Sequence, residues 1–419
     1  MNVTAILAIT LPLVAYGLVS RKIEGSILTG PILFSLFGLI AGPAAFGLIP
    51  LQISNEALHL LAEVTLILVL FSDAANIDLA QLRRDHDLPV RMLLVGMPLT
   101  IILGAVAALL LFDDFELWEA ALLAAILAPT DAALGQAVVS NRIVPVRIRQ
   151  ALNVESGLND GIALPFILIF AAFASAMQAD TDTGMWLLFG AKQVILGPLT
   201  GIAIGYVGAK LVASCYSKRW MSESAEGMIA LGLAFGAFAL AEAVHGNGFI
   251  AAFVAGLTFG NTLKQKCQYL YEFAESEGQI LILLTFMAFG AAMVPQAMGA
   301  VTITHLLFGI LALTVLRMLP IYLSLIGTGV KPVTSAFLGW FGPRGLASIL
   351  FVLLILEEAE LANESKIFAI VIITVALSVA LHGMTAGPAA RWYGLMSQRM
   401  GECEENRPVS DEPFTGPTK

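Results

Sequence analysis

Apolar residues occur in long runs, separated by short polar stretches, along nearly the whole of this 419-residue chain. A helix that crosses the hydrocarbon core of a membrane needs roughly 20 predominantly apolar residues. The runs that stand out are 3–20, 26–48, 56–73, 90–112, 117–139, 150–177, 185–213, 224–244, 247–260, 273–294, 301–326, 332–356 and 366–389. The pattern predicts an all-α polytopic membrane protein with about thirteen transmembrane helices.

Composition supports this interpretation, since 58% of the residues are hydrophobic and 13% are charged. A soluble domain has about 45–50% apolar and about 25% charged residues. These values exclude a soluble enzyme, a secreted protein, a nucleic-acid-binding protein and a disordered chain. The net charge of −9 gives no reason to expect a nucleic-acid partner. The expected partner is membrane lipid, and no cofactor is expected.

The basic residues divide the loops into two classes. Of the 22 Lys and Arg residues, 18 lie in alternate loops and the C-terminal tail, and only Lys366 lies on the opposite side. The other three, Lys192, Arg317 and Arg344, fall inside apolar runs. Because Lys and Arg accumulate on the cytoplasmic side, we expect the N-terminus outside and the C-terminus in the cytoplasm.

The expected cytoplasmic side also holds the three cysteines, Cys215, Cys267 and Cys403. Their positions suggest neither a disulfide nor a metal site. Residues 391–419 are polar and rich in Pro and Gly, so we expect a short, disordered cytoplasmic tail.

Charged side chains inside the apolar runs are the candidates for function, because a charge at the bilayer centre costs at least ~2.5–3.5 kcal/mol on insertion scales. They gather in the stretches Ala-Pro-Thr-Asp at 128–131, Asn-Val-Glu-Ser-Gly-Leu-Asn-Asp-Gly at 153–161, and Phe-Gly-Pro-Arg-Gly at 341–345. In the second stretch, Ser156, Asn159 and Asp160 share one helix face. Their oxygen atoms are hard ligands that suit Na⁺ or Li⁺.

Prolines predict a break in two of the apolar runs. Pro129 removes a backbone donor from the fifth run, and Gly342-Pro343 interrupts the twelfth. Two broken helices at matching positions are typical of secondary transporters built from inverted repeats, with a site at the membrane midplane. We therefore expect two inverted six-helix repeats, 1–177 and 214–390, joined by a connecting span, 178–213.

The charges expected near the midplane favour one-for-one exchange. They sum to −1 and belong to Asp131, Glu155, Asp160, Arg317 and Arg344. One bound proton or one bound monovalent cation neutralises this set. The sum leaves out residues whose depth the sequence does not define: Glu63, Glu242 and Lys192.

The string Glu155-Ser-Gly-Leu-Asn-Asp160, which follows Thr130-Asp131 and precedes Gly342-Pro-Arg344-Gly, resembles the monovalent cation:proton antiporter-1 family of sodium/proton exchangers. The resemblance extends over all thirteen runs. It implies a homodimer of thirteen-helix protomers, each with a dimerisation domain and a six-helix core that moves like an elevator. It also implies a compact prokaryotic member in the inner (plasma) membrane, a transporter and not an enzyme, which serves pH homeostasis.

The resemblance assigns roles to the polar residues. It implies that Asp160 carries either the cation or the proton, and that Asp131, Ser156 and the backbone of Thr130 help to hold Na⁺. Glu155 would form a structural ion pair with Arg344, and Arg317 would be a further basic neutraliser. Asn159 followed by Asp160, where electrogenic relatives carry two aspartates, implies electroneutral exchange.

Alternatives to Na⁺/H⁺ exchange remain open. A K⁺/H⁺ antiporter would use the same mechanism, and the sequence does not define ion size. An intramembrane aspartyl protease could use two membrane aspartates, but the Gly-x-Gly-Asp motif of that class is absent. A channel would need filter-like segments or a ring of charges, and neither is visible.

For the other polar residues, a structural role is a simpler interpretation than a functional one. Asp73 and Asp78 are expected to be solvated at the end of the third run. His59, His245 and His305 lie at run ends, where interfacial histidines are common, although a histidine can sense pH near neutrality.

Overall fold

The computed structural model describes residues 3–23, 26–49, 55–84, 86–179, 183–222, 225–263, 268–359, 361–401 and 403–406. The first half contains α1 (Val3–Ile23), α2 (Gly30–Ala41), α3 (Asn55–Ala75), α4 (Leu79–Arg84), α5 (Asp87–Arg91), the π-helical turn η1 (Met92–Gly96), α6 (Met97–Leu111), α7 (Leu117–Ile126), α8 (Ala132–Val139) and α9 (Val146–Ala179). The second half contains α10 (Thr183–Ser217), α11 (Ala225–Ala243), α12 (Gly248–Thr262), α13 (Gln268–Ala288), the π-helical turn η2 (Phe289–Met293), α14 (Val294–Met298), α15 (Ile303–Leu313), α16 (Val315–Ser324), α17 (Pro332–Trp340), α18 (Leu346–Glu358), α19 (Glu364–Arg399) and the 3₁₀ turn η3 (Glu404–Asn406).

Every predicted apolar run contains a helix or a series of consecutive helices, and the described ranges contain no strand. Seven helices in these ranges are long and apolar enough to cross a membrane, and five shorter apolar helices accompany them. The all-α membrane class is therefore confirmed. Helices satisfy their own backbone hydrogen bonds, which is why hydropathy alone finds them in a membrane protein.

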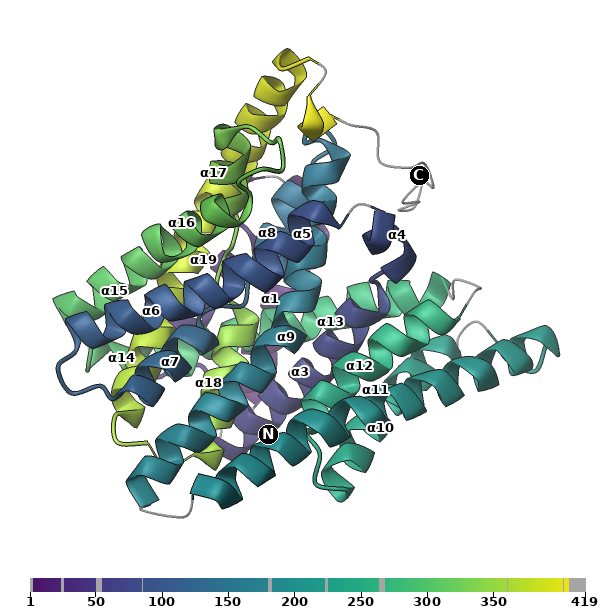
Figure 1. Cartoon of the computed structure of the whole chain (residues 1–419), viewed down its shortest axis with the longest axis horizontal. Coiled ribbons are helices and arrows are strands. Elements are labelled where there is room, and N and C mark those ends of the chain that lie inside the picture. The colour runs from purple at the N-terminus through teal and green to yellow at the C-terminus, as the bar shows by residue number, and fades with distance from the viewer. Residues whose placement is uncertain are drawn as a thin grey trace.

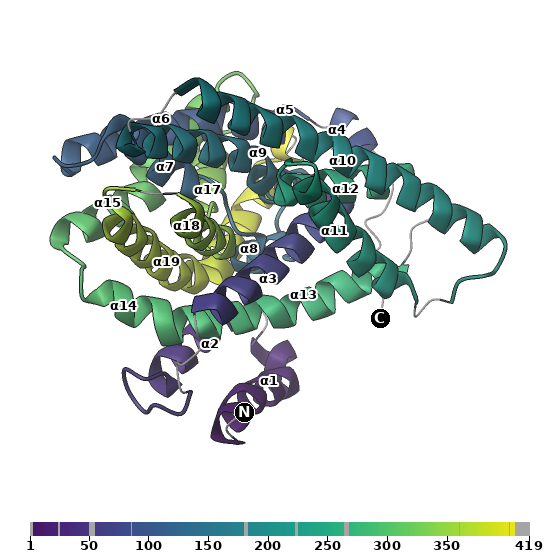
Figure 2. The same cartoon turned by 90° about the horizontal axis from the view of Figure 1, so that it is seen from below.

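The helices pack into two bundles (Figure 1). In the first bundle, α12 packs against α10, α11 and α3, and α13 packs against α2 and α3. The second bundle contains α6–α9 and α15–α19, with α9 beside α7 and α15 beside α19. Figure 2 shows α1 at the edge of the molecule, in contact chiefly with α2.

Glycines bring the helices of the first bundle into backbone contact. A Cβ atom at Gly201 or Gly205 of α10 would overlap backbone atoms of α12, and one at Gly256 or Gly260 of α12 would overlap carbonyl oxygens of α3. Each pair is spaced by four residues. Small residues at this spacing are the usual basis of close helix packing in membranes.

The face of α9 toward the first bundle is also glycine-lined. Gly157 lies against Ile77, at the end of α3, and a Cβ atom at Gly161 would overlap the ring of Phe253 in α12. At these two positions α9 has no side chain of its own, so Ile77 and Phe253 pack directly against its backbone.

Both predicted breaks are present. The chain is non-helical between α7 and α8 and between α17 and α18, at the sites of Pro129 and Gly342-Pro343. The two breaks cross each other, because the Asp131 backbone N–H donates to the Pro343 carbonyl oxygen at 2.8 Å. The assignment of residues 1–177 and 214–390 as repeats remains a prediction.

The expected disorder of the C-terminal tail is wrong for its first part. Helix α19 continues to Arg399, and Gly401, with φ +70°, turns the chain back so that η3 packs on the protein. The polar composition is misleading because Tyr393 and Ser397 of this helix are buried. Residues 407–419 lie outside the described residues.

Candidate functional site

Asp131 lies where the two broken helices cross, directly before the start of α8. Its Oδ2 accepts a hydrogen bond of 2.6 Å from the backbone N–H of Leu346, the first residue of α18. The Asp131 carboxylate thus satisfies an N-terminal donor and offsets the positive end of the helix dipole. Gly345 is required beside it, because a Cβ atom there would overlap this oxygen.

Arg344 makes the opposite contact in the same crossing. Its Nη1 donates to the carbonyl oxygens of Ala128 and, at 3.0 Å, Pro129, just beyond the end of α7. A cation at a helix C-terminus is favourable for the dipole. A charged residue from each half of the chain therefore offsets the dipole of a broken helix in the other half.

Glu155 pairs with Arg317 and not with Arg344, so the ion pair expected from the resemblance is wrong. Arg317 Nη2 lies 2.5 Å from Glu155 Oε1, and both side chains are at most 2% exposed. The guanidinium of Arg344 is drawn instead to the broken end of α7, where backbone carbonyls have no helical partner. Arg344 and Glu155 still attract each other through their charges.

Thr130, Ser156 and Asn159 form a connected polar group between the first break and α9. The Thr130 and Ser156 hydroxyl oxygens lie 3.1 Å apart, and Asn159 Nδ2 donates to Thr130 Oγ1 at 2.5 Å. All three residues are buried. The Asn159 amide oxygen remains a buried acceptor with no donor among the described residues.

Asp160 follows Asn159 on α9 and is 7% exposed. Its Oδ1 is buried and receives no hydrogen bond from any described residue. A buried acceptor without a donor is costly, and a cation or a proton would satisfy it. Asp160 and Asn159 thus present two unsatisfied oxygen atoms beside the hydroxyl pair, which is the chemistry that a hard monovalent cation prefers.

Asp73 belongs to this environment, although the sequence suggested a solvated helix end. It is only partly exposed, at the last turn of α3, and it is close enough to interact electrostatically with both Asp131 and Asp160. The described residues contain no group of three His, Cys, Asp or Glu side chains that could jointly hold a metal ion. The charges of Asp73, Asp131 and Asp160 influence one another electrostatically. A cation bound among them also needs hydroxyl, amide or backbone oxygens as ligands.

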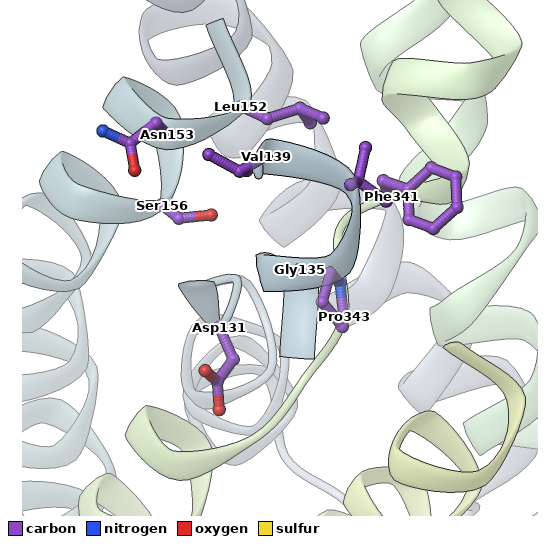
Figure 3. A pocket seen from close by; sticks show the side chains of 9 residues that line it. Asp131, Gly135, Val139, Leu152, Asn153, Ser156, Phe341 and Pro343 are labelled. Carbon is purple, nitrogen blue, oxygen red and sulfur yellow. The ribbon is translucent and has the colours of Figure 1, made fainter. Parts of the chain in front are cut away.

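A small pocket lies beside Asp131 and Ser156, on the side of α8 (Figure 3). Its lining includes Ser156, whose hydroxyl points toward the space between α8 and α9, and Phe341 and Pro343 from the second break. The Asp131 carboxylate points away from Gly135, toward the start of α18. Asn153 also lines the pocket, one helical turn before Ser156.

Two buried residues of α19, Ser378 and His382, support the crossing, although neither was predicted from the sequence. The Arg344 N–H donates to Ser378 Oγ at 2.7 Å, and His382 Nε2 lies 2.9 Å from the Trp340 carbonyl oxygen at the end of α17. The signal was present in the sequence, because Thr374, Ser378 and His382 repeat every four residues within an apolar run.

Two of the remaining candidates, His305 and Glu242, have structural roles. The Thr302 hydroxyl accepts from the His305 N–H, and the Thr302 N–H donates to His305 Nδ1, so His305 completes a capping box for α15. Glu242 accepts from the Gly248 N–H at the start of α12. Lys192 is exposed, and Glu63 is half-buried in α3. The side chain of His59 lies outside the described residues.

Asp131→Ala is expected to lower the free energy of unfolding by about 1–2 kcal/mol, because the α18 cap and its charge are lost together. Asp131→Asn keeps an oxygen acceptor for Leu346, so it is expected to lose less than half as much. Thermal unfolding of the purified protein measures both, with the exposed Asp113→Ala as a control expected to show no change. Equal losses for Ala and Asn would contradict the capping role.

The family model described as "Sodium/hydrogen exchanger, transmembrane" matches residues 6–392. The chain belongs to the sodium/hydrogen exchanger family of cation:proton antiporters. The family predicted from the sequence is therefore confirmed. The family consists of transporters and not enzymes, which argues against the aspartyl-protease alternative.

The chain is similar to the K(+)/H(+) antiporter NhaP of Alkalimonas amylolytica, with 23% identity over 94% of this chain and 67% of the relative. It is also similar to the K(+)/H(+) antiporter NhaP2 of Shewanella sp. (strain ANA-3), with 24% identity over 86% of this chain and 62% of the relative. The chain thus spans about two thirds of the length of these curated relatives. Among solved structures, the sodium proton antiporter MjNhaP1 of Methanocaldococcus jannaschii matches with a TM-score of 0.77 and 21% identity, over 95% of this chain and 99% of that one. This likeness shows that the two proteins share a fold.

Proposed function

We propose that this protein exchanges Na⁺ or Li⁺ for H⁺ across the membrane, with Asp160 as the shared site. The observation that supports this most directly is the buried, unsatisfied carboxylate oxygen of Asp160, on the same helix as the unsatisfied amide oxygen of Asn159. A site built of carboxylate, amide and hydroxyl oxygens suits a hard monovalent cation.

The mechanism is a competition between two ligands for one carboxylate. Ionised Asp160 binds the cation together with Ser156 and oxygen atoms of Thr130, and protonation of Asp160 releases it. Asp131 supports the cation mainly by its charge, since its Oδ2 is engaged by Leu346. A low pH therefore favours the proton-loaded carrier, and a high pH frees the carboxylate for the cation.

Asp73 changes the charge balance expected from the sequence. With it, four carboxylates and two guanidinium groups leave the fully ionised site at −2. One bound monovalent cation still leaves −1, so a neutral loaded site needs one further proton on a carboxylate. Electroneutral one-for-one exchange therefore requires that the protonation of the remaining carboxylates be the same in the cation-loaded and the proton-loaded carrier.

Alternating access is proposed to follow from an elevator-like movement of the second bundle relative to the first. The homodimer expected from the resemblance has a plausible contact in α1, of which only 6% is buried within the chain. In this proposal the protein lies in the inner (plasma) membrane, with the N-terminus outside and the C-terminus in the cytoplasm, where it supports pH homeostasis.

K⁺/H⁺ exchange is the second candidate. The relatives from Alkalimonas and Shewanella are both named K(+)/H(+) antiporters, whereas the solved structure is of a sodium proton antiporter. All the described oxygen ligands can bind either ion, and the choice between them depends on sub-ångström ligand positions.

The test is transport by purified protein in liposomes that contain a trapped pH dye. External Na⁺ or Li⁺ is expected to drive internal alkalinisation at a rate that does not depend on an imposed membrane potential. A response to K⁺ alone would move the substrate to the second candidate. A rate that follows the potential would overturn electroneutrality, and silence with every alkali cation would overturn the proposed function.

A further inference from the structure

The C-terminal segment Cys403–Asn406, here called the tail latch, is held at the predicted cytoplasmic end of the second bundle (Figure 1). The Asn406 side-chain amide donates to the carbonyl oxygens of Ser397 at 3.0 Å and Gly401 at 2.9 Å, which fixes the turn back onto α19. Arg147 at the start of α9 is 8% exposed and donates from Nη1 to both the backbone and the side chain of Glu404.

Glu405 is the centre of the tail latch and is 1% exposed. Its Oε1 accepts from the backbone N–H of Lys331 at 2.7 Å and from the Thr334 hydroxyl at 2.8 Å. Lys331 is the residue before α17, so the carboxylate caps the N-terminus of this half-helix from a distant part of the chain.

The Glu405 carboxylate is charged at neutral pH. Burial would raise its pKa, but hydrogen bonds from Lys331, Thr334 and neighbouring groups hold the pKa below its usual value. The charged form that the α17 dipole favours is therefore the form present in the cytoplasmic pH range.

A continuous series of contacts leads from Glu405 to the wall of the pocket. The Tyr393 hydroxyl lies 3.0 Å from the Thr334 hydroxyl, and the Tyr393 ring stacks on Phe337 with centroids 4.0 Å apart and an interplanar angle of 15°. The Phe337 ring lies 4.7 Å from that of Phe341, which lines the pocket beside Ser156. Each of these side chains is buried.

We propose that Glu405 is a positioning residue for transport, which holds α17 and thereby keeps Phe341 at the pocket wall in the position that cation entry requires. Of the two readouts below, only the transport assay depends on the proposed function. The tail latch acts through α17 and does not touch the cation. Loss of the cap lets the start of α17 move, and the stacked rings pass this movement to the pocket.

The first test compares Glu405→Ala with Glu405→Gln in the full chain. The Ala variant is expected to raise the KM for the transported cation by about fivefold, the size expected when one helix cap is lost, with a smaller change in maximal rate. Gln keeps the acceptor oxygen and is expected to stay within about twofold of the parent chain. Arg399 is exposed at the end of α19. The Arg399→Ala variant serves as the matched control and is expected to leave the KM unchanged.

The second test measures opening of the tail latch without a transport assay. Cys403 is half-buried beside Glu405, so its alkylation by N-ethylmaleimide reports opening once Cys215 and Cys267 are replaced by Ser. Alkylation is expected to be several times faster in Glu405→Ala. In the chain that keeps Glu405, saturating Na⁺ is expected to change the rate, and Asp160→Asn is expected to remove this dependence.

The two readouts separate the possible failures. An unchanged KM in Glu405→Ala, or equal KM shifts for Ala and Gln, would overturn the positioning role. If Glu405→Ala does not fold, the proposal is tested by the Na⁺ dependence of Cys403 alkylation in the parent chain. An alkylation rate that does not change with Na⁺, Li⁺ or K⁺ overturns the proposal. Alkylation that responds to a cation without any proton exchange would instead refute the proposed function and support the coupling.

Discussion

Asp160→Asn is expected to abolish cation-driven proton movement, down to the level of protein-free liposomes, while folding is preserved. Asparagine has nearly the same shape and keeps one oxygen acceptor. It cannot release a proton or offer a negative charge, and both ligands of the proposed competition need these properties. Because Asp160 Oδ1 receives no hydrogen bond from the described residues, the substitution breaks no hydrogen bond at that oxygen atom.

The measurement pairs the liposome assay with expression level and thermal unfolding of the same preparation. Asn159→Ser is a useful comparison, because it removes the amide, with its unsatisfied oxygen and its hydrogen bond to Thr130, but leaves the carboxylate, so reduced exchange is expected to remain. Exchange that survives in Asp160→Asn would remove Asp160 from the carrier role. Loss of folded protein would show that the carboxylate is structural.

The second large effect is expected at the ion pair between Glu155 and Arg317. Both side chains are almost fully buried, and removal of one partner leaves the other charge buried and unpaired. Such a loss costs about 3–5 kcal/mol in proteins. Glu155→Gln is therefore expected to lower folded yield and thermal stability strongly, and Arg317→Met is expected to do the same.

A double-mutant cycle distinguishes the observed pair from the one expected by resemblance. The double variant Glu155→Gln/Arg317→Met is expected to be more stable than the sum of the single losses predicts, by at least about 1 kcal/mol. The corresponding cycle between Glu155 and Arg344 is expected to show a smaller coupling, since their charges attract without direct contact. A larger coupling with Arg344 would contradict the pairing in the structure.

The parts of the fold that were predictable are those with a local cause. Helices in the membrane follow from apolar runs because unsatisfied backbone groups are too costly there. The breaks followed from Pro129 and Gly342-Pro343, and the shared face of Ser156, Asn159 and Asp160 followed from helical spacing. These features depend on residues a few positions apart, so one sequence is enough to find them.

The parts that were missed depend on long-range geometry. Arg317 and Arg344 are chemically equivalent candidates for Glu155, and only the fold decides which one reaches it. Asp73 was expected in solvent because it ends an apolar run, but the neighbouring helices enclose it near the site. Glu405 lies in a polar tail whose composition favours disorder, yet it is buried because α17 offers unsatisfied N–H groups at its start.

The glycine-lined face of α9 has a consequence for the speed of the cycle. Where two bundles interdigitate through side chains, sliding one past the other requires each ridge to climb out of its groove. Gly161 leaves a notch in α9 that the ring of Phe253 fills, and Gly157 leaves room for Ile77, so these two side chains have to leave α9 before the bundles can slide in the proposed elevator movement. Because rate falls tenfold for about every 1.4 kcal/mol of barrier, the packing of Phe253 and Ile77 against α9 would set part of the turnover rate if the proposed movement is the transport step.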